Sequence, residues 1–162
     1  MTLIALALAA LVQTTPVDCT DADHRAFDFW IGDWTVTAVA SGTVVADSRI
    51  ESVAGGCAIQ ETYHQTVGPG GTPTDYRGHS YSAFDATDGV WRQFYVDSNG
   101  SVSAFAGEAV DGAMVLIVDR GEVRQRMTVA PAGNGAVRQT GEVSRDGGRT
   151  WSTGYEFLYR PR

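Results

Sequence analysis

The sequence contains no lysine, and arginine supplies all 12 of its basic side chains. The absence of lysine excludes Schiff-base catalysis, a Walker-type phosphate site and any reaction that needs an amine of lowered pKa. Acidic residues outnumber the arginines by 19 to 12, and the formal net charge is -7. Such a surface would repel a phosphate backbone, so nucleic acid is not an expected partner.

Cysteine and histidine are also scarce. The two cysteines, Cys19 and Cys57, form no CxxC motif and no Cys/His cluster, which argues against a structural zinc site. The histidines are His24, His64 and His79, and their spacing matches no ligand signature of a metal or haem site. We therefore expect neither a metal nor another cofactor.

Long hydrophobic runs are limited to one stretch, Leu3–Val12, which is followed by polar residues and Pro16. A membrane-spanning helix needs about 20 apolar residues, so this run is too short for a permanent anchor. It fits the hydrophobic region of a secretory signal peptide. The sequence thus predicts a signal peptide over residues 1–18, with an open cleavage site, and a mature domain over 19–162. The alternatives are a true start codon elsewhere or a buried N-terminal helix.

Export bears on the two cysteines, because disulfides persist in oxidising compartments. An even pair in an exported chain predicts a bond between Cys19 and Cys57, which would pin the start of the mature chain to the third strand. The alternative is two unrelated thiols, with Cys57 packed as a small apolar residue. The expected location is periplasmic or secreted, with no membrane anchor in the mature form.

The length of 162 residues, with 43% hydrophobic residues, is that of a single soluble domain. From Asp33 onward, short stretches rich in β-branched and aromatic residues alternate with Gly, Asn and Asp turns. This rhythm is typical of an all-β meander. The predicted strands are Trp34–Val39, Val44–Val53, Ala58–Gln65, Gly78–Asp85, Val90–Asp97, Ser101–Glu108, Ala113–Asp119, Glu122–Val129, Ala136–Val143 and Thr150–Tyr159.

These strands, about ten in number and joined by short loops, predict a single closed antiparallel up-and-down β-barrel. Closure removes the exposed strand edges that an open sheet of this length would present. The one longer loop, 68–75, contains two prolines and is expected at a barrel mouth. Before the first strand, the acidic start of Thr20–Phe27 favours a short N-terminal helix.

A short helix that runs into Gly32-Asp33-Trp34 opens the first predicted strand. This segment is similar to the Gly-x-Trp that opens strand one in lipocalins and their calycin relatives. The resemblance implies that Trp34 plugs the closed end of the barrel. It also implies that an arginine of the last strand, here Arg160, covers the indole through a cation–π contact. Both residues would then be structural.

The wider pattern resembles a family of small exported bacterial proteins of uncharacterised function, a domain-of-unknown-function group with a calycin-like barrel. The motifs that carry the resemblance cover nearly all of the mature chain. They are FDFWIGDWTV, SRIESVAGGCAIQE, the segment 82–100, DGAMVL and VRQTGEVSRDGGRTW. The resemblance implies the fold and export, and it supplies no catalytic residues to transfer.

The segment Ser144–Trp151 matches the Asp-box pattern S-x-D-x-G-x-T-W of sialidase-like propellers. A propeller needs several copies, and this chain has one. In such a turn Asp146 and the serine hold the hairpin, the glycines accept positive φ, and Trp151 packs under the turn. We interpret the motif as a hairpin staple rather than as the remnant of a glycosidase.

Polar and aromatic residues at alternate positions of the middle strands are the candidate site. Alternate residues of a barrel strand point inward, unless this face is outward and Phe94 with its apolar neighbours fills the interior. Hydrogen-bonding groups beside aromatic walls suit a small-molecule pocket. The predicted ligand-binding residues are Glu61, Tyr63, Tyr81, Trp91, Gln93, Tyr95 and Tyr155.

Three functions are compatible with this pattern. The first is an exported barrel that binds a small, partly hydrophobic molecule, which Glu61 and Gln93 orient. The second is a barrel enzyme, such as an isomerase, cyclase or lyase, with a desolvated Glu61 as base and a tyrosine as acid. The third is a filled barrel that acts through its surface. We take the first as the leading interpretation, and we favour a pocket over a filled core because a buried Glu61 needs a purpose or a partner.

Overall fold

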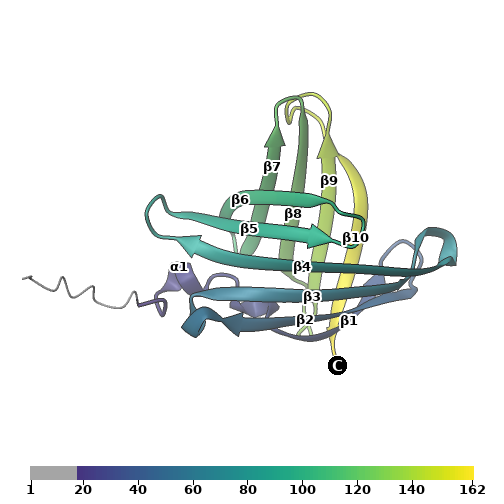
Figure 1. The fold of residues 1–162 in the computed structure, drawn as a ribbon, viewed down its shortest axis with the longest axis horizontal. Coiled ribbons are helices and arrows are strands. Elements are labelled where there is room, and N and C mark those ends of the chain that lie inside the picture. The colour runs from purple at the N-terminus through teal and green to yellow at the C-terminus, as the bar shows by residue number, and fades with distance from the viewer. Residues whose placement is uncertain (1–17) are drawn as a thin grey trace, which may run out of the picture.

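The computed structural model describes residues 18–162, so the predicted signal peptide lies, apart from Asp18, outside the described residues. The described chain forms a closed barrel of ten antiparallel strands, in which each strand pairs with its neighbours in sequence and β1 pairs with β10 (Figure 1). The predicted fold class is therefore confirmed. The strands are β1 (Gly32–Ala38), β2 (Val44–Val53), β3 (Ala58–Val67), β4 (Pro73–Asp85), β5 (Val90–Asp97), β6 (Val102–Val110), β7 (Ala113–Arg120), β8 (Val123–Pro131), β9 (Val137–Ser144) and β10 (Ser152–Pro161).

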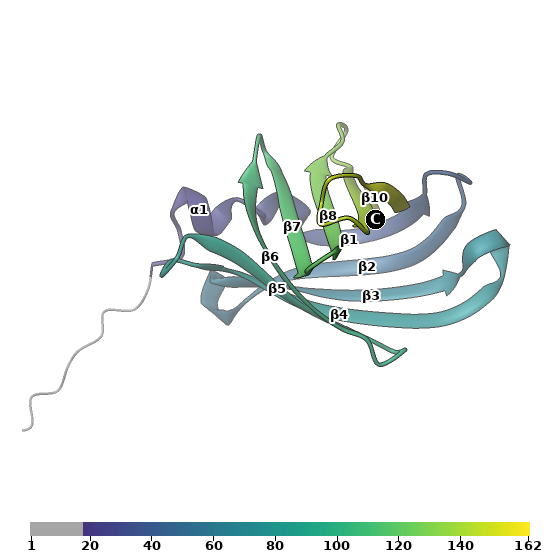
Figure 2. The same cartoon turned by 90° about the horizontal axis from the view of Figure 1, so that it is seen from above.

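The helical elements are short. They are the α-helix α1 (Ala22–Arg25) and three 3-10 turns, η1 (Asp28–Trp30), η2 (Ala54–Gly56) and η3 (Pro69–Gly71). None of the helices within residues 18–162 combines the length and the apolar composition that crossing a membrane requires. Figure 2 shows α1 at the end of the barrel that is opposite the β3–β4 turn.

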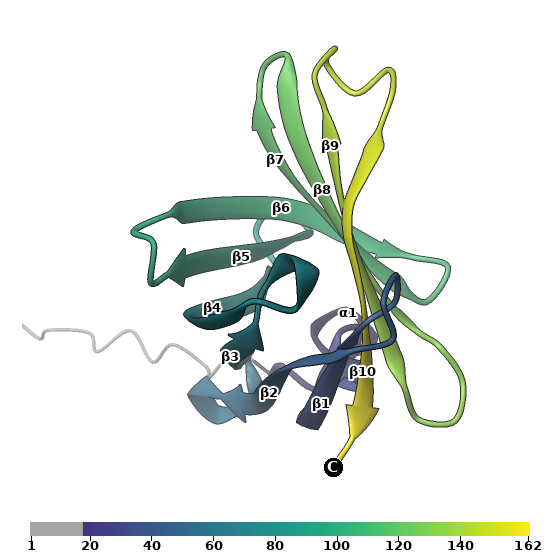
Figure 3. The same ribbon diagram turned by 90° about the vertical axis from the view of Figure 1, so that its right-hand side faces the viewer.

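The barrel has a crossed arrangement because its sheet twists strongly. Strands β2–β5 lie across β7–β10 in Figure 1. In Figure 3 the β5–β6 hairpin extends to one side of the barrel, whereas the β7–β8 and β9–β10 hairpins both extend upward. The largest boundary difference from the prediction is at β4, which starts at Pro73 instead of Gly78, so the expected loop 68–75 is shorter. Pro73 is the first residue of that strand, a position at which a missing N–H is tolerated.

Aromatic side chains fill one end of the barrel. Phe27 and Trp30 are fully buried and stack with their ring centroids 5.0 Å apart. Trp91 meets the Phe27 ring edge-on and donates its Nε1–H to the Asp23 carbonyl at 3.2 Å. Trp34 donates its Nε1–H to the Trp30 carbonyl at 2.9 Å. We call this cluster of Phe27, Trp30, Trp34 and Trp91 the aromatic plug.

The predicted cation–π contact between Arg160 and Trp34 is wrong. Arg160 is exposed on the outer face of β10, where its Nη1 lies 3.5 Å from Thr37 Oγ1. The residue before it, Tyr159, points inward and meets the Trp34 ring edge-on at a centroid distance of 6.3 Å. Because side chains alternate between the two faces of a strand, the tyrosine takes the inner position and the arginine the outer one.

The predicted disulfide between Cys19 and Cys57 is confirmed. It joins the segment before α1 to the residue that follows η2, at the start of β3. Arg25 of α1 adds a hydrogen bond to the Gly56 carbonyl at 3.1 Å. These links hold the N-terminal segment against the plugged end of the barrel. A disulfide is more typical of extracellular and periplasmic proteins than of cytosolic ones.

The hairpin between β9 and β10 is organised by Asp146. Its carboxylate accepts hydrogen bonds from the Ser144 hydroxyl at 2.7 Å and from the Thr150 hydroxyl at 2.7 Å. Hydrogen bonds from the side chain and backbone of Thr150, and then from Ser144, lower the pKa of Asp146 to about 2. Trp151 packs beneath the guanidinium of Arg126, 4.2 Å from the ring centroid, in the only cation–π pair of residues 18–162. These contacts are those of a structural turn.

Candidate functional site

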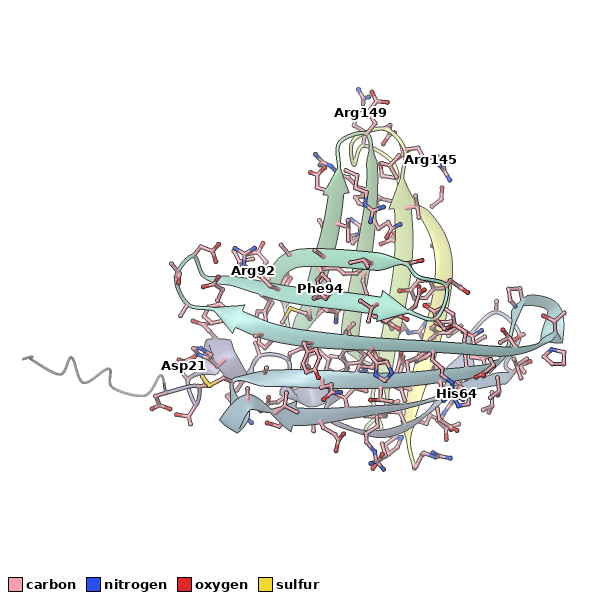
Figure 4. The ribbon with its side chains drawn as sticks, viewed as in Figure 1. Asp21, His64, Arg92, Phe94, Arg145 and Arg149 are labelled. Atoms are coloured by element: carbon pink, nitrogen blue, oxygen red, sulfur yellow. A yellow bond between two sulfur atoms is a disulfide. The ribbon has the colours of Figure 1, made fainter. Side chains whose placement is uncertain are left out.

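Strand β5 turns Gln93 and Tyr95 into the barrel. Gln93 is 3% exposed, whereas Phe94 between them, labelled in Figure 4, is 52% exposed. The Gln93 amide donates to the Ser82 hydroxyl of the neighbouring strand β4 at 3.0 Å. The sequence alone leaves open which face of β5 points inward. The structure shows that the face carrying Gln93 and Tyr95 does.

Tyr81 does not belong to this inner set. It lies opposite Phe94 in the register and is 55% exposed, while its neighbours Ser80 and Ser82 are buried. A shift of one position along a strand moves a side chain to the opposite face. The prediction that Tyr81 lines the interior is therefore wrong.

A cavity of about 590 Å³ opens inside the barrel and extends to Gly68 and Pro69 in the β3–β4 turn. This turn and α1 lie at opposite ends of the barrel (Figure 1). Trp91 does not line the cavity, because it belongs to the aromatic plug. The placement of Trp91 in the ligand-binding set is therefore wrong. The cavity brings together the other members of the predicted set, Glu61, Tyr63, Gln93, Tyr95 and Tyr155.

Four further aromatic residues line the cavity and are absent from the predicted set: Tyr76, Phe105, Phe157 and Tyr159. Phe157 and Tyr159 follow Tyr155 at intervals of two along β10, so strand alternation alone could have identified them. Tyr76 lies in the part of β4 that precedes the predicted start of that strand. No local signal in the sequence marks that part as a strand.

Glu61 lies on β3 with only 5% of its surface exposed. Its Oε1 accepts a hydrogen bond from the Ser48 hydroxyl of β2 at 2.8 Å. Burial raises the pKa of Glu61 from 4.5 to about 7, against the smaller opposing effects of hydrogen bonds from Ser48 and Tyr159. Glu61 therefore gains or loses its proton near neutral pH.

A chain of hydrogen bonds continues from Glu61 across the interior. The Tyr159 hydroxyl, which is within hydrogen-bonding reach of Glu61, donates to Gln139 Oε1 at 2.8 Å. The Gln139 amide in turn donates to Met127 Sδ at 2.9 Å. Burial raises the pKa of Tyr159 well above its ordinary value.

A second hydrogen-bonded group lies where β5 ends. Tyr76 donates its hydroxyl proton to Asp97 Oδ2 at 3.1 Å, so Tyr95 is the donor in the 2.6 Å contact between the two tyrosine hydroxyls. Asp97 Oδ1 accepts the backbone N–H groups of Asn99 at 2.8 Å and Ser101 at 3.1 Å. Burial raises the pKa of Asp97, but the bonds from Ser101, Asn99 and Tyr76 outweigh it and lower the pKa overall. Asp97 is thus ionised at neutral pH.

Two glycines make room for cavity-lining rings. A Cβ at Gly78 would lie 1.9 Å from the Tyr95 hydroxyl oxygen, and one at Gly141 would lie 2.1 Å from Tyr155 Cε1. Neither glycine has a positive φ. Glycine is therefore required at both positions because a Cβ would clash with a ring, and not because of the backbone conformation. The Tyr155 ring also stacks on Phe157, with the centroids 5.0 Å apart. Cross-strand contact with glycine therefore positions both tyrosines on the wall of the cavity.

Gly141→Ala is expected to lower the free energy of unfolding by about 1–3 kcal/mol, because its methyl group would displace the Tyr155 ring. Gly154→Ala in the adjacent strand is the matched control, since an added Cβ there meets no atom closer than 3.6 Å. We expect the control to be neutral or stabilising, because alanine loses less conformational entropy than glycine on folding. Urea unfolding measures both. Equal stability of the two variants would contradict the position of the ring.

The histidines lie away from the cavity. His64 Nε2 contacts Asp75 Oδ1 at 2.8 Å on an exposed part of the surface, where Figure 4 labels it. His24 packs edge-on against Phe84 near the plug, and His79 is exposed. Within residues 18–162, no group of three or more His, Cys, Asp or Glu side chains is arranged to hold a metal ion.

The lining of the cavity is chemically simple. It offers carboxyl groups, tyrosine hydroxyls and glutamine amides beside aromatic surface, so it can donate and accept hydrogen bonds and exchange a proton at Glu61.

Comparison with protein-family models gives no match, and comparison with curated proteins gives none either. The resemblance to a family of small exported bacterial proteins therefore stays a prediction.

Proposed function

We propose that the protein is an exported β-barrel that binds a small, partly hydrophobic molecule in its interior. The observation that carries this proposal is the cavity of about 590 Å³. Ligand pockets range from about 300 to about 1,000 Å³ and combine apolar walls with a few polar groups that orient the ligand. Five tyrosine and two phenylalanine rings line this cavity, together with Glu61, Asp97 and four glutamines.

The cavity favours binding over a filled barrel that acts through its surface. In a solid core, the inward-facing tyrosines would meet one another at close-packed density and leave no ligand-sized space. Here the buried hydrophobic core, which includes the aromatic plug, leaves a cavity that reaches the β3–β4 turn. The Cys19–Cys57 disulfide supports export, because such bonds persist in oxidising compartments.

A barrel enzyme is the second candidate, and Glu61 is the observation that favours it. A carboxyl group with a pKa of about 7 inside a cavity has the property of a general base, and the hydroxyl of Tyr159 lies beside it. The other carboxylate, Asp97, is a weak base because its hydrogen bonds lower its pKa. Binding is the first candidate because it requires only the cavity.

The test uses the neutral fluorescent probe N-phenyl-1-naphthylamine, whose emission rises in apolar surroundings. We expect saturable binding of one probe per barrel. Ser103 lines the cavity, and Ala104, the next residue, is exposed on the outer face. Ser103→Trp should weaken probe binding about tenfold or more by filling the cavity, whereas Ala104→Trp should change it by less than about twofold. Absence of saturable binding to the wild type, or equal binding by both variants, would contradict the proposal.

A further inference from the structure

The cavity contains negative charge and no positive charge. Two carboxyl groups line it, Glu61 and Asp97, and no Arg or His within residues 18–162 does so. The arginines nearest in sequence to lining residues of β8, Arg124 and Arg126, face the outside and pair with Asp119 and Glu142. An anionic ligand would therefore meet no counter-charge inside the barrel.

The aromatic wall is suited to a positive charge. The faces of aromatic rings carry partial negative charge and attract cations. The rings of Tyr63 and Tyr76 are nearly perpendicular, at 74°, with centroids 6.2 Å apart, and those of Tyr155 and Phe157 are stacked. The rings thus surround the cavity in different orientations, so a cation inside it can approach more than one of them.

Glu61 lacks a charged partner. The groups that act on it or respond to its charge are the hydroxyls of Ser48 and of five tyrosines, Tyr63, Tyr76, Tyr95, Tyr155 and Tyr159. All are neutral at neutral pH. A buried carboxylate is normally paired with a positive group, because desolvation is costly without one.

The hydrogen-bonding capacity around Glu61 is also incompletely used. The carboxylate accepts a hydrogen bond from Ser48 at Oε1 and lies within reach of Tyr159, whose single proton also bonds Gln139, so it can accept a further donor. The Ser80 hydroxyl, opposite Glu61 in the register, is buried and has no hydrogen-bond partner among the described residues. Asp97 differs, because its two oxygens already accept hydrogen bonds from Asn99, Ser101 and Tyr76.

We propose that the ligand is an organic cation, with an amine or quaternary ammonium group on an apolar body. This inference rests on the proposed function. Its charge lies among the tyrosine rings with Glu61 as the counter-charge. Asp97 adds a fixed negative charge where β5 ends, and the net charge of -7 attracts cations to the protein. The ligand supplies the positive partner that the protein itself does not place beside Glu61.

The test compares three probes of similar size and different charge: phenyltrimethylammonium, its neutral isostere tert-butylbenzene, and the anion benzenesulfonate. Each displaces N-phenyl-1-naphthylamine from the wild type in phosphate buffer, which contains no competing amine. At about pH 8.5, where Glu61 is ionised, we expect the cation to bind about tenfold or more tightly than tert-butylbenzene. We expect no displacement by benzenesulfonate over the same concentrations.

Glu61→Gln isolates the counter-charge. This variant should weaken phenyltrimethylammonium binding about tenfold and change tert-butylbenzene binding by less than about twofold, because the amide keeps the shape and loses the charge. Glu51→Gln, on the exposed outer face of β2, is the control and should change neither. The wild type provides a measurement that needs no variant. Its affinity for the cation should fall about tenfold from pH 8.5 to pH 5.5 as Glu61 gains its proton, with no such fall for tert-butylbenzene.

The outcomes separate the two proposals. If tert-butylbenzene or benzenesulfonate binds as tightly as the cation, or if Glu61→Gln has no effect on cation binding, the ligand class is wrong and the binding function stands. If none of the three probes binds and N-phenyl-1-naphthylamine does not bind either, both proposals fail.

Discussion

Removal of the disulfide by the double substitution Cys19→Ala and Cys57→Ala is expected to lower the free energy of unfolding by about 4 kcal/mol. The two cysteines are 38 residues apart, and a cross-link over a loop of that length restricts the unfolded chain by about this amount in the loop-entropy model. The melting temperature should fall by roughly 10 °C for a domain of this size. Urea unfolding and calorimetry of the oxidised wild type and the double variant measure the two quantities.

Reduction provides the internal control for this prediction. Reducing the wild type should reproduce the loss, and the same reductant should leave the double variant unchanged. The effect should be confined to the plugged end, where the bond holds the segment before α1 against the start of β3. Binding of N-phenyl-1-naphthylamine should therefore survive in the folded double variant. Equal stability of the oxidised wild type and the double variant would contradict the prediction.

The strand order and most strand boundaries could be predicted because local residues determine the turns. Asp111 and Asn134 adopt positive φ values of 50° and 51°, and each is followed by a glycine that also has positive φ. Asp-Gly and Asn-Gly pairs are among the few that take up such turns at low cost. With short turns at regular intervals, each strand has its sequence neighbours as partners.

The face of β4 could not be predicted from hydrophobicity. Its inner positions hold the small polar Ser80 and Ser82, and the large Tyr81 between them faces solvent. The serines fit because the side chains opposite them, Tyr95 and Gln93, are long and occupy the interior. Which face of β4 points inward thus depends on the volumes of the side chains on the neighbouring strands. The sequence of β4 alone does not give those volumes.

The sequence also does not give the position of an inward-facing side chain along the barrel axis. Trp91, Gln93 and Tyr95 share one face of β5, and alternation correctly groups them. Yet Trp91 lies in the plug beside Phe27, and the other two line the cavity. A period of two identifies which side chains point inward. It does not determine which end of the barrel the N-terminal segment fills, and this decides whether an inward side chain is core or binding site.

The stability of the wild type relative to Glu61→Gln is expected to depend on pH by about 3 kcal/mol. The pKa of Glu61 rises from 4.5 to about 7 on folding because burial disfavours its charge. Below pH 4.5 the group is neutral in both states. As pH rises toward 7 the unfolded chain loses this proton first, so the folded state loses stability; above pH 7 the full cost is present. Glutamine has no proton to lose and avoids the cost.

Urea unfolding of both proteins at about pH 4, 5.5, 7 and 8.5 tests this difference. Lowered pKa values at Asp75, Asp97 and Asp146 act in the opposite direction, but they are common to both proteins and cancel in the comparison. Glu51→Gln should give a difference from wild type that does not change with pH. A flat difference for Glu61→Gln would contradict the assigned burial of the carboxyl group.

The same measurement connects stability with the proposed ligand. A cation bound beside Glu61 favours the ionised carboxylate and so lowers its pKa in the folded state. Saturating phenyltrimethylammonium should therefore stabilise the wild type most above pH 7 and reduce the pH dependence that distinguishes it from Glu61→Gln. tert-Butylbenzene, which carries no charge, should stabilise both proteins without changing that dependence. A pH dependence that the cation leaves intact would mean that its charge does not lie beside Glu61.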